Sequence, residues 1–191
     1  MAPSKKNARR LGAHLVFADE SGFLLIPTVR RTWAPRGQTP RLRHSYRHDR
    51  LSALSAISIS PRRRRVHLYY QIHDHNLRRR EVCRFVSHLL RHLRGPIFLL
   101  WDNIAIHRGG PIEKLRDRNP RLRLVPFPAY APELNPDEGV WRTCKAQLAN
   151  GQPEHLDRLW GDLFLTLEDL RASPSKLRGC IRQSDLPPFL F

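Results

Sequence analysis

The sequence predicts an α/β fold in which a mixed five-stranded sheet, built from an antiparallel hairpin plus parallel strands, is flanked by helices. Two observations predict it. In the second half of the chain, short apolar runs rich in β-branched and aromatic residues alternate with helical patterns, which is typical of parallel strands covered by helices. In the first half, two strand patterns are joined by a short connection, which indicates an antiparallel hairpin. A length of 191 residues suits one domain with a proper core.

The expected elements follow from local patterns of apolar residues and of chain breakers. The first strand is expected to break at Ser21-Gly22, and Gly95-Pro96 should end the first helix. In chain order the elements are a strand at 14–20, strands at 51–60 and 65–72, a helix at 80–93, a strand at 97–102, a short helix at 110–118, a strand at 122–127, a helix from Asn135, and a helix over about 154–172.

The helix from Asn135 has the clearest start signal in the chain. Three prolines at positions 126, 128 and 132 stiffen its approach, because each restricts φ and lacks a backbone donor. Asn135 is a good N-cap, Pro136 fits the first helical position, and Asp137 and Glu138 fall in the first turn, where acids complement the helix dipole. The pattern therefore predicts that a carboxylate of the first helical turn has a fixed position, because the segment before the helix is rigid.

The composition favours a polyanionic partner. The chain has 34 Lys and Arg against 17 Asp and Glu, for a formal net charge of +17. Such an excess favours nucleic acid, because each neutralised phosphate releases counterions, and an anionic membrane surface is the lesser alternative. An Arg-rich proteome would explain the preference for Arg over Lys better than it explains the excess over acids.

Candidate phosphate contacts lie in two basic stretches, one irregular and one in the hairpin connection. The alternative for the hairpin connection is a merely solvated basic turn. The candidates are Arg30, Arg31, Arg36, Arg62, Arg63, Arg64 and Arg65.

The cysteines and the hydropathy of the chain indicate the cellular compartment in which we expect the protein. Cys83, Cys144 and Cys180 are widely spaced and odd in number, which indicates core thiols in a reducing environment. No apolar run approaches the ~18 residues that span a membrane, and no signal-peptide core follows the basic start. We therefore expect a soluble, cytoplasmic protein.

Three carboxylates stand out as a candidate metal site. Asp19 and Asp102 each end a predicted buried strand, and Glu138 lies in the first turn of a helix. If the two strands are neighbours, these acids converge at one edge of the sheet, where sites gather in folds of this kind. Converging like charges favour a divalent cation, and oxygen ligands with few histidines select Mg²⁺ or Mn²⁺, with two ions as the expectation for phosphoryl transfer.

Four stretches carry a resemblance to a known family. They are VFADESGF at 16–23, RTWAPRGQTP at 31–40, LWDNIAIH at 100–107 and PAYAPELNPDEGVW at 128–141. In this order they resemble the DDE-superfamily endonuclease domain of bacterial insertion-sequence transposases related to the Tc/mariner group. The 35 residues between Asp102 and Glu138 resemble the last spacing of that group's acidic triad.

The resemblance implies an RNase H-like catalytic domain, which we expect over 13–150. The residues themselves predict a basic, disordered arm at 1–12 and a C-terminal helical extension at 151–191, packed on the same domain. It implies that Asp19, Asp102 and Glu138 are the catalytic, metal-binding triad. The implied activity is metal-dependent cleavage of DNA followed by strand transfer.

The implied partners are the DNA of the element ends and of the target, and a second copy of the chain in a dimer or higher assembly on DNA. Because the first strand begins at residue 14, the sequence also suggests that a helix-turn-helix DNA-recognition half is separately encoded. The protein would then associate with the nucleoid. The alternatives are a non-catalytic DNA-binding remnant and a nuclease without strand transfer.

Several residues beside the triad have two interpretations. Asn103 and His107 either support the metal or phosphate, or merely cap a turn and a short helix; Asn135 is interpreted first as a helix cap. Glu20 is set aside in favour of Asp19, because neighbouring strand residues point to opposite faces.

Two further positions are judged on packing. Asp137 departs from the family pattern, which is apolar there, and would either disturb the metal site and the packing or sit in solvent at the helix N-terminus. Trp33 and Trp141 are interpreted as packing residues rather than base-stacking platforms.

Overall fold

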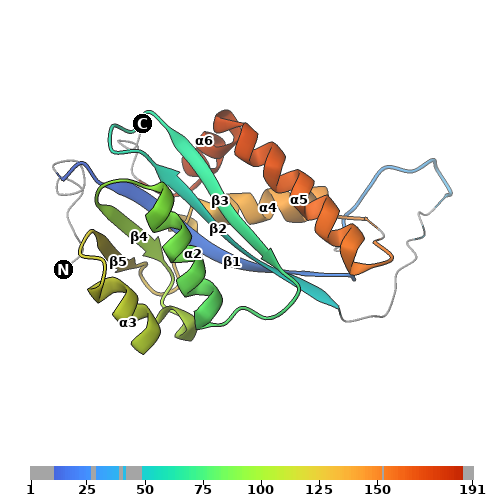
Figure 1. Cartoon of the computed structure of the whole chain (residues 1–191). Coiled ribbons are helices and arrows are strands. Elements are labelled where there is room, and N and C mark those ends of the chain that lie inside the picture. Colours follow the sequence, from blue (N-terminus) through green and yellow to red (C-terminus); the bar gives the residue numbers. More distant parts are fainter. Residues whose placement is uncertain (1–10, 27–28, 39–40, 42–48, 152, 187–191) are drawn as a thin grey trace.

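The computed structural model describes residues 11–26, 29–38, 41, 49–151 and 153–186 (Figure 1). The strands are β1 (His14–Leu24), β2 (Arg50–Ile59), β3 (Val66–His73), β4 (Ile97–Trp101) and β5 (Leu122–Pro126). The α-helices are α2 (Arg79–His92), α3 (Gly110–Asp117), α4 (Asp137–Gln147), α5 (Leu156–Ala172) and α6 (Pro174–Gln183). Two 3₁₀ turns, η1 (Ala105–His107) and η2 (Pro132–Leu134), precede α3 and α4.

The five strands form one mixed sheet in the order β3-β2-β1-β4-β5. β1, β2 and β3 pair antiparallel in succession, whereas β4 runs parallel to β1 and β5 runs parallel to β4. The predicted combination of an antiparallel hairpin with parallel strands is therefore confirmed. The long central strand β1 joins the two parts, because it pairs with β2 on one side and with β4 on the other.

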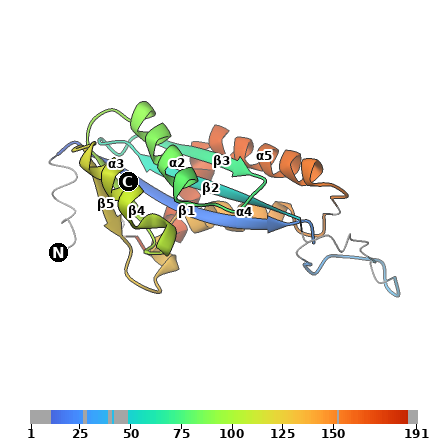
Figure 2. The ribbon, with the colours of Figure 1, turned by 60° about the horizontal axis from the view of Figure 1, so that its bottom comes forward.

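Helices cover both faces of the sheet (Figures 1 and 2). On one face, α2 and α3 pack on even-numbered β1 residues such as Val16 and Ala18. On the other face, α4, α5 and α6 pack on odd-numbered β1 residues such as Phe17 and Phe23. Since side chains alternate along a strand, consecutive residues of β1 serve two separate cores.

The first strand is longer than expected, and the predicted break at Ser21-Gly22 is wrong. β2 continues to pair with β1 there, with Gly22 opposite Ser52 and Phe23 opposite Leu51. The Phe23 ring is buried edge-on against Trp141, with ring centroids 5.9 Å apart. Asp19 therefore lies within β1 rather than at its end. It nevertheless lies beyond the parallel pairing with β4, whose last pair is Phe17 with Leu100.

The helix predicted from Asn135 is α4, which begins at Asp137. The Asn135 side chain still serves the helix start, because its Oδ1 accepts a hydrogen bond from the Asp137 backbone N–H at 3.2 Å. One glycine of α4 has a packing role, since a Cβ on Gly139 would lie 2.8 Å from the Cβ of Cys180 in α6. The close approach of α4 and α6 therefore depends on this glycine.

The predicted C-terminal helix at about 154–172 is α5, but α6 was not predicted separately. Both helices share a core with α4 and β3, through residues such as Leu163 and Leu177. The first ten residues of the expected basic arm at 1–12 lie outside the described residues. The three cysteines are free thiols. Among the described helices, none is long and apolar enough to cross a membrane.

Candidate metal centre

Two of the predicted acids come from the adjacent parallel strands β1 and β4. The register pairs Phe17 with Leu100, so continuing it by two residues places Asp102 level with Asp19. Asp19 is largely buried, and its pKa is raised to about 8, first by burial and then by the negative charges of Glu138, Glu20 and Asp102. The structure therefore brings Asp19 within electrostatic reach of both other members of the predicted triad.

Glu138 reaches this group from the exposed side of α4's first turn. The preceding segment is fixed to the sheet, because Phe127 donates its backbone N–H to the Trp101 carbonyl at 2.8 Å. The Phe127 ring also stacks on Phe17, with centroids 6.3 Å apart. These contacts, with the prolines that follow, set where α4 starts and hence where Glu138 lies relative to Asp19.

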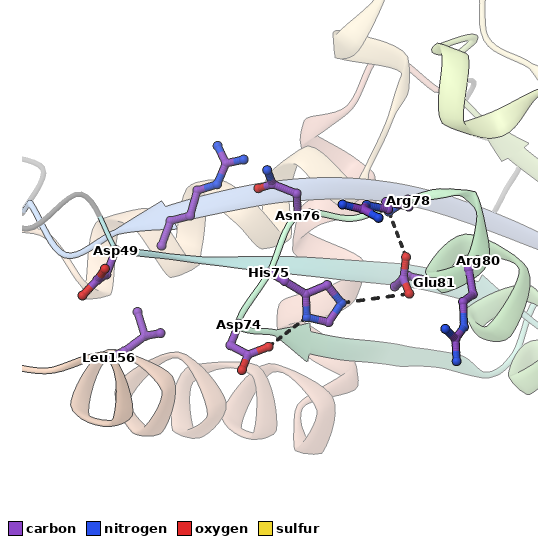
Figure 3. A pocket seen from close by; sticks show the side chains of 9 residues that line it. Asp49, Asp74, His75, Asn76, Arg78, Arg80, Glu81 and Leu156 are labelled. Atoms are coloured by element: carbon purple, nitrogen blue, oxygen red, sulfur yellow. Dashed lines mark hydrogen bonds and ion pairs between the residues drawn. The ribbon is translucent and has the colours of Figure 1, made fainter.

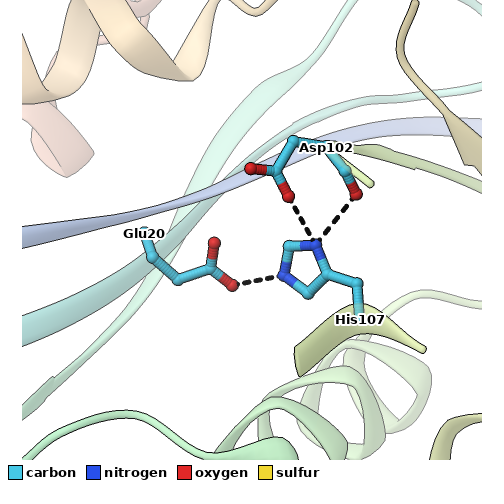
Figure 4. Close-up of side chains that lie close together, drawn as sticks. All are labelled: Glu20, Asp102 and His107. Carbon is cyan, nitrogen blue, oxygen red and sulfur yellow. Dashed lines mark hydrogen bonds and ion pairs between the residues drawn. The ribbon is translucent and has the colours of Figure 1, made fainter. Parts of the chain in front are cut away.

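The opposite face of the sheet contributes a histidine held between two carboxylates (Figure 4). Nδ1 of His107 lies 2.7 Å from Asp102 Oδ1 and 3.0 Å from the Asp102 carbonyl oxygen. Its Nε2 lies 2.5 Å from Oε1 of Glu20. The ring is buried and stacks on Trp101, with centroids 4.3 Å apart and planes 2° apart.

This arrangement favours a protonated imidazole. Burial alone would lower the pKa of His107, but the hydrogen bonds to Asp102 and Glu20 and the charge of Glu20 raise it to about 10. Conversely, burial would raise the pKa of Asp102, but the hydrogen bond and charge of His107 lower it. At neutral pH the ring is therefore a cation that donates to both carboxylates and holds Asp102 ionised.

Glu20, Asp102 and His107 also lie close enough together to share a metal ion, with one ligand atom of each within 4.8 Å of the others. In the structure, however, each ring nitrogen already faces one carboxylate at hydrogen-bond distance. We therefore assign the ring to orienting Asp102. The oxygen atoms of Asp102, Asp19 and Glu138 remain as hard donors of the kind that Mg²⁺ and Mn²⁺ prefer.

Asp137 does not sit in solvent, so that alternative is wrong. Its side chain is fully buried, and its Oδ2 accepts a hydrogen bond from Ser55 Oγ at 2.5 Å. Ser55 is the β2 partner of Asp19. Burial raises the pKa of Asp137 well above its ordinary value, partly opposed by the Ser55 hydrogen bond, and the charge of Asp19 raises it further. The Asp137 carboxyl thus packs beside the other acids in a buried position.

Of the other residues considered in the sequence analysis, some are exposed and others are buried. Asn103 is exposed and its carbonyl accepts a hydrogen bond from Arg108, while Asn135 is buried and its Nδ2 donates to the Ala18 carbonyl at 3.4 Å. Trp141 is buried, as expected for a packing residue. Trp33 is 98% exposed, so its interpretation as a packing residue is wrong.

The predicted phosphate contacts lie apart from the acids. Arg30, Arg31 and Arg36 are exposed in the connection between β1 and β2. The run Arg62, Arg63, Arg64 and Arg65 forms the turn between β2 and β3, at the end of the sheet where β1 begins. Arg63 donates to the carbonyls of Ala13 and Ser60, both at 3.3 Å, so its guanidinium is engaged in the turn itself.

A hollow of about 690 Å³ lies elsewhere, between the end of β3 and the start of α2 (Figure 3). Its charges balance one another: His75 lies 2.8 Å from Asp74 and 4.0 Å from Glu81, and the Arg78 backbone N–H donates to Glu81 at 3.0 Å. None of the three predicted acids lines it. Its size therefore does not make it the functional site.

Sequence reasoning missed the parts played by Glu20 and Ser55. Strand alternation correctly predicted that Asp19 and Glu20 face opposite sides, but it could not show that a histidine from the β4–α3 connection would meet Glu20. Ser55 carried no signal, because a serine in an apolar strand predicts no particular partner.

Comparisons with known proteins identify a family and a fold. A family model for the DDE superfamily endonuclease matches residues 14–159. No curated protein matches the chain. Among solved structures, the chain is similar to a pre-cleavage Mos1 transpososome (TM-score 0.58, 14% identity, 96% of this chain and 59% of that chain). It is similar to the catalytic domain of Mos1 mariner transposase (TM-score 0.51, 11% identity, 95% and 93%).

A viral complex is also similar, the simian T-cell lymphotropic virus intasome with PP2A regulatory subunit B56 gamma (TM-score 0.51, 10% identity, 93% of this chain and 56% of that chain). The likeness to these structures shows an RNase H-like fold, as the sequence predicted. The chain spans 61% of the chain in the Mos1 strand transfer complex.

Proposed function

The chain belongs to the DDE superfamily endonuclease family, and we propose that it is the catalytic part of a transposase. It would cleave a DNA phosphodiester and join the freed 3′ end to target DNA. The observation that carries the proposal is that the buried Asp19, which follows the last β1–β4 pair, feels the negative charges of both Glu138 and Asp102. The similar Mos1 structures include a strand transfer complex and paired-end complexes with Mn and with Mg.

The residues fit a divalent cation. Asp19, Asp102 and Glu138 offer carboxylate oxygens, and the raised pKa of Asp19 reflects burial and then the repulsion that a cation would relieve. Mg²⁺ or Mn²⁺ suits such a donor set, and two ions suit phosphoryl transfer. When bound, the metal supplies an activated attacking oxygen and neutralises charge on the transferring phosphoryl group.

The chain's own side chains set the geometry for that chemistry. In this proposal the paired strands β1 and β4 position Asp19 and Asp102, and the anchored start of α4 positions Glu138. Asn135 supports this start, since it bonds both the α4 backbone and the β1 carbonyl of Ala18. The reaction needs no covalent protein intermediate, because the attacking groups are water and then the DNA 3′ hydroxyl.

Glu20 and His107 act as positioning residues in this proposal. A carboxylate that orients a histidine, which in turn orients a metal ligand, is a common supporting arrangement, although here the ligand is Asp102 rather than the ring. Loss of such a partner typically costs 10- to 100-fold in metal affinity or activity. Asn103, next to Asp102, remains a candidate contact to phosphate.

The proposed partners are DNA at the element ends and at the target. A net charge of +17 favours this partner, and the exposed Arg30, Arg31 and Arg36 are candidate phosphate contacts. A dimer or larger assembly on DNA and a separately encoded helix-turn-helix half complete the proposal, with association with the nucleoid as its consequence.

The experiment compares wild type with Asp102→Asn in nicking of supercoiled plasmid and in joining of oligonucleotides that carry the inverted repeats flanking the coding sequence. We expect both activities in wild type with Mg²⁺ or Mn²⁺, and neither with EDTA or in the variant. Asp117→Asn, an exposed acid at the end of α3, is the matched control and should retain activity. Equal activity of wild type and Asp102→Asn would refute the mechanism.

The same assay separates the alternative functions. Nicking without joining would indicate a nuclease that lacks strand transfer. Salt-dependent DNA binding without nicking in either metal would indicate a non-catalytic remnant. Only the joined product supports the full transposase proposal.

A further inference from the structure

We propose that the exposed side of α2 carries a second DNA-contact surface, formed by Arg80, Arg84 and Arg91. The inference rests on the proposed function and extends it to a surface outside the metal centre. These side chains line a hollow of about 500 Å³ together with Cys83 and Ser87 of α2 and Pro111 of α3. We call these three residues the α2 arginine row.

The α2 arginine row has no acidic counterpart. On the opposite face, three cations of α5 and α6 are paired: Arg158 lies 3.3 Å from Asp162, Arg171 lies 2.5 Å from Glu168, and Lys176 lies 2.5 Å from Asp169. Arg178 of α6 instead donates to the Arg64 carbonyl at 2.9 Å. Among the described residues, no such ion pair involves a member of the α2 arginine row. Each member of the row therefore carries a positive charge that no carboxylate in the described part of the chain offsets by an ion pair.

Without a bound partner, the α2 arginine row lowers the stability of its helix. Arg80 and Arg84 are four residues apart, and like charges at that spacing destabilise a helix by a few tenths of a kcal/mol. All three side chains are exposed, whereas the other side of α2 is buried through Val82, Phe85 and similar residues. The row therefore contributes nothing to the core, and a bound polyanion would offset its mutual repulsion.

The spacing of the row suits a phosphate backbone. At a rise of about 1.5 Å per residue, Arg84 lies about 6 Å along the helix from Arg80, and Arg91 about 10 Å further. Duplex DNA carries one charge per about 1.7 Å of its axis, so a contact of this length meets several phosphates. The Ser87 hydroxyl donates to the Cys83 carbonyl at 2.7 Å, which leaves the guanidinium groups as the charged donors facing the hollow.

The row begins beside the segment that carries His107. Arg79, next to Arg80, donates from Nε to the carbonyls of Arg108 at 2.8 Å and Ala105 at 3.3 Å. These bonds attach the start of α2 to the segment that carries His107, which in turn holds Asp102. DNA that enters the metal centre can therefore continue along α2. We infer that the row holds duplex flanking the cleaved phosphodiester, through phosphates rather than bases.

The test measures binding apart from catalysis. In an Asp102→Asn background, the triple variant Arg80→Ala, Arg84→Ala, Arg91→Ala is titrated with a fluorescent 30-base-pair duplex of arbitrary sequence at several NaCl concentrations. We expect the slope of log K against log salt to become shallower by about 2 to 3, since each lost phosphate contact removes about 0.9. Affinity at low salt should fall at least about tenfold.

The matched control removes the same charge from the other face. It is Arg158→Ala, Arg171→Ala, Lys176→Ala, whose surface ion pairs contribute little to stability. This control should keep nearly the parent slope. The replacement of all three arginines of the row by lysine should restore binding, because lysine contacts phosphate as a point charge; this excludes misfolding as the cause of the loss.

The outcomes separate this inference from the proposed function. Suppose that the Asp102→Asn protein binds DNA with a steep salt dependence, and that both triple alanine variants lose this binding equally. The inference about the α2 arginine row is then overturned, while the proposed function stands. If wild type and variants all fail to bind DNA, the proposed function falls as well. A photo-crosslinker on Cys83, which lines the hollow and is the only cysteine that is not buried, should attach to bound DNA. Absence of that crosslink under saturating DNA would also overturn the inference.

Discussion

Replacement of Glu20 by glutamine tests the histidine between two carboxylates. Glutamine preserves the shape and can still accept a hydrogen bond from His107 Nε2, but it removes the negative charge 2.5 Å away. The pKa of His107 is raised from 6.5 to about 10, which corresponds to about 5 kcal/mol of preference for the protonated ring in the folded state. Because two carboxylates share this effect, loss of one should cost about 2–3 kcal/mol.

The pH dependence has a definite sign. A raised histidine pKa stabilises the fold fully below the unfolded value of 6.5, and the contribution disappears as pH rises through about 10. Urea unfolding should therefore show wild type more stable than Glu20→Gln at pH 6 and nearly equal to it at pH 10.5. In the variant, the NMR titration of His107 should move down by at least about one pH unit.

Two results would contradict this reasoning. One is equal stability of wild type and Glu20→Gln at pH 6. The other is a stability difference that persists at pH 10.5, since that would indicate a packing defect rather than lost charge. Glu113→Gln is the control, because Glu113 is an exposed acid in the first turn of α3 and should change neither measurement.

Four further predictions each concern a single residue. Because the pKa of Asp19 is raised to about 8, metal-free protein should lose stability as pH rises from about 4 to 8; Asp19→Asn should flatten this slope by up to about 1.4 kcal/mol per pH unit, and an unchanged slope in urea titrations would refute it. Gly139→Ala should cost about 1–3 kcal/mol in urea unfolding, because its Cβ would lie 2.8 Å from that of Cys180; a neutral effect would show that α6 yields easily. Asp137→Leu should leave unfolding free energy unchanged or raised, because one carboxyl oxygen is buried without a partner; a loss above about 3 kcal/mol would contradict this. Trp33→Ala should leave the melting temperature unchanged, since the ring is 98% exposed; a large drop would restore its packing role.

The sequence predicted the sheet and most helices because their apolar patterns are local. The parallel strands 97–102 and 122–127 and the helix at 80–93 correspond to β4, β5 and α2 with small changes at their ends. The predicted break at Ser21-Gly22 failed because a strand can continue through polar or small residues when a partner strand supplies hydrogen bonds. That partner lies some thirty residues away, beyond any local pattern.

Asp137 shows a different limit of sequence reasoning. A carboxylate in the first turn of a helix is favourable in solvent, so the local rule points outward. The structure buries it because α4 crosses the sheet at Ser55, whose hydroxyl supplies one hydrogen bond. Whether an acid in a first turn meets water or a strand depends on how the helix packs. Helix packing depends in turn on contacts with distant segments, such as that of Gly139 with Cys180 of α6.

Because side chains alternate along β1, this one strand supplies a residue of the candidate site to each face of the sheet. Asp19 faces the α4 side, where Glu138 adds to its repulsion, and Glu20 faces the α2 side, where it holds His107. His107 in turn binds Asp102, which follows β4 and lies level with Asp19. The acid that would bind metal and the acid that would orient a metal ligand are thus adjacent in sequence but separated by the sheet. A cation would therefore relieve the negative charge on the α4 side, while the His107 imidazolium already balances it on the α2 side.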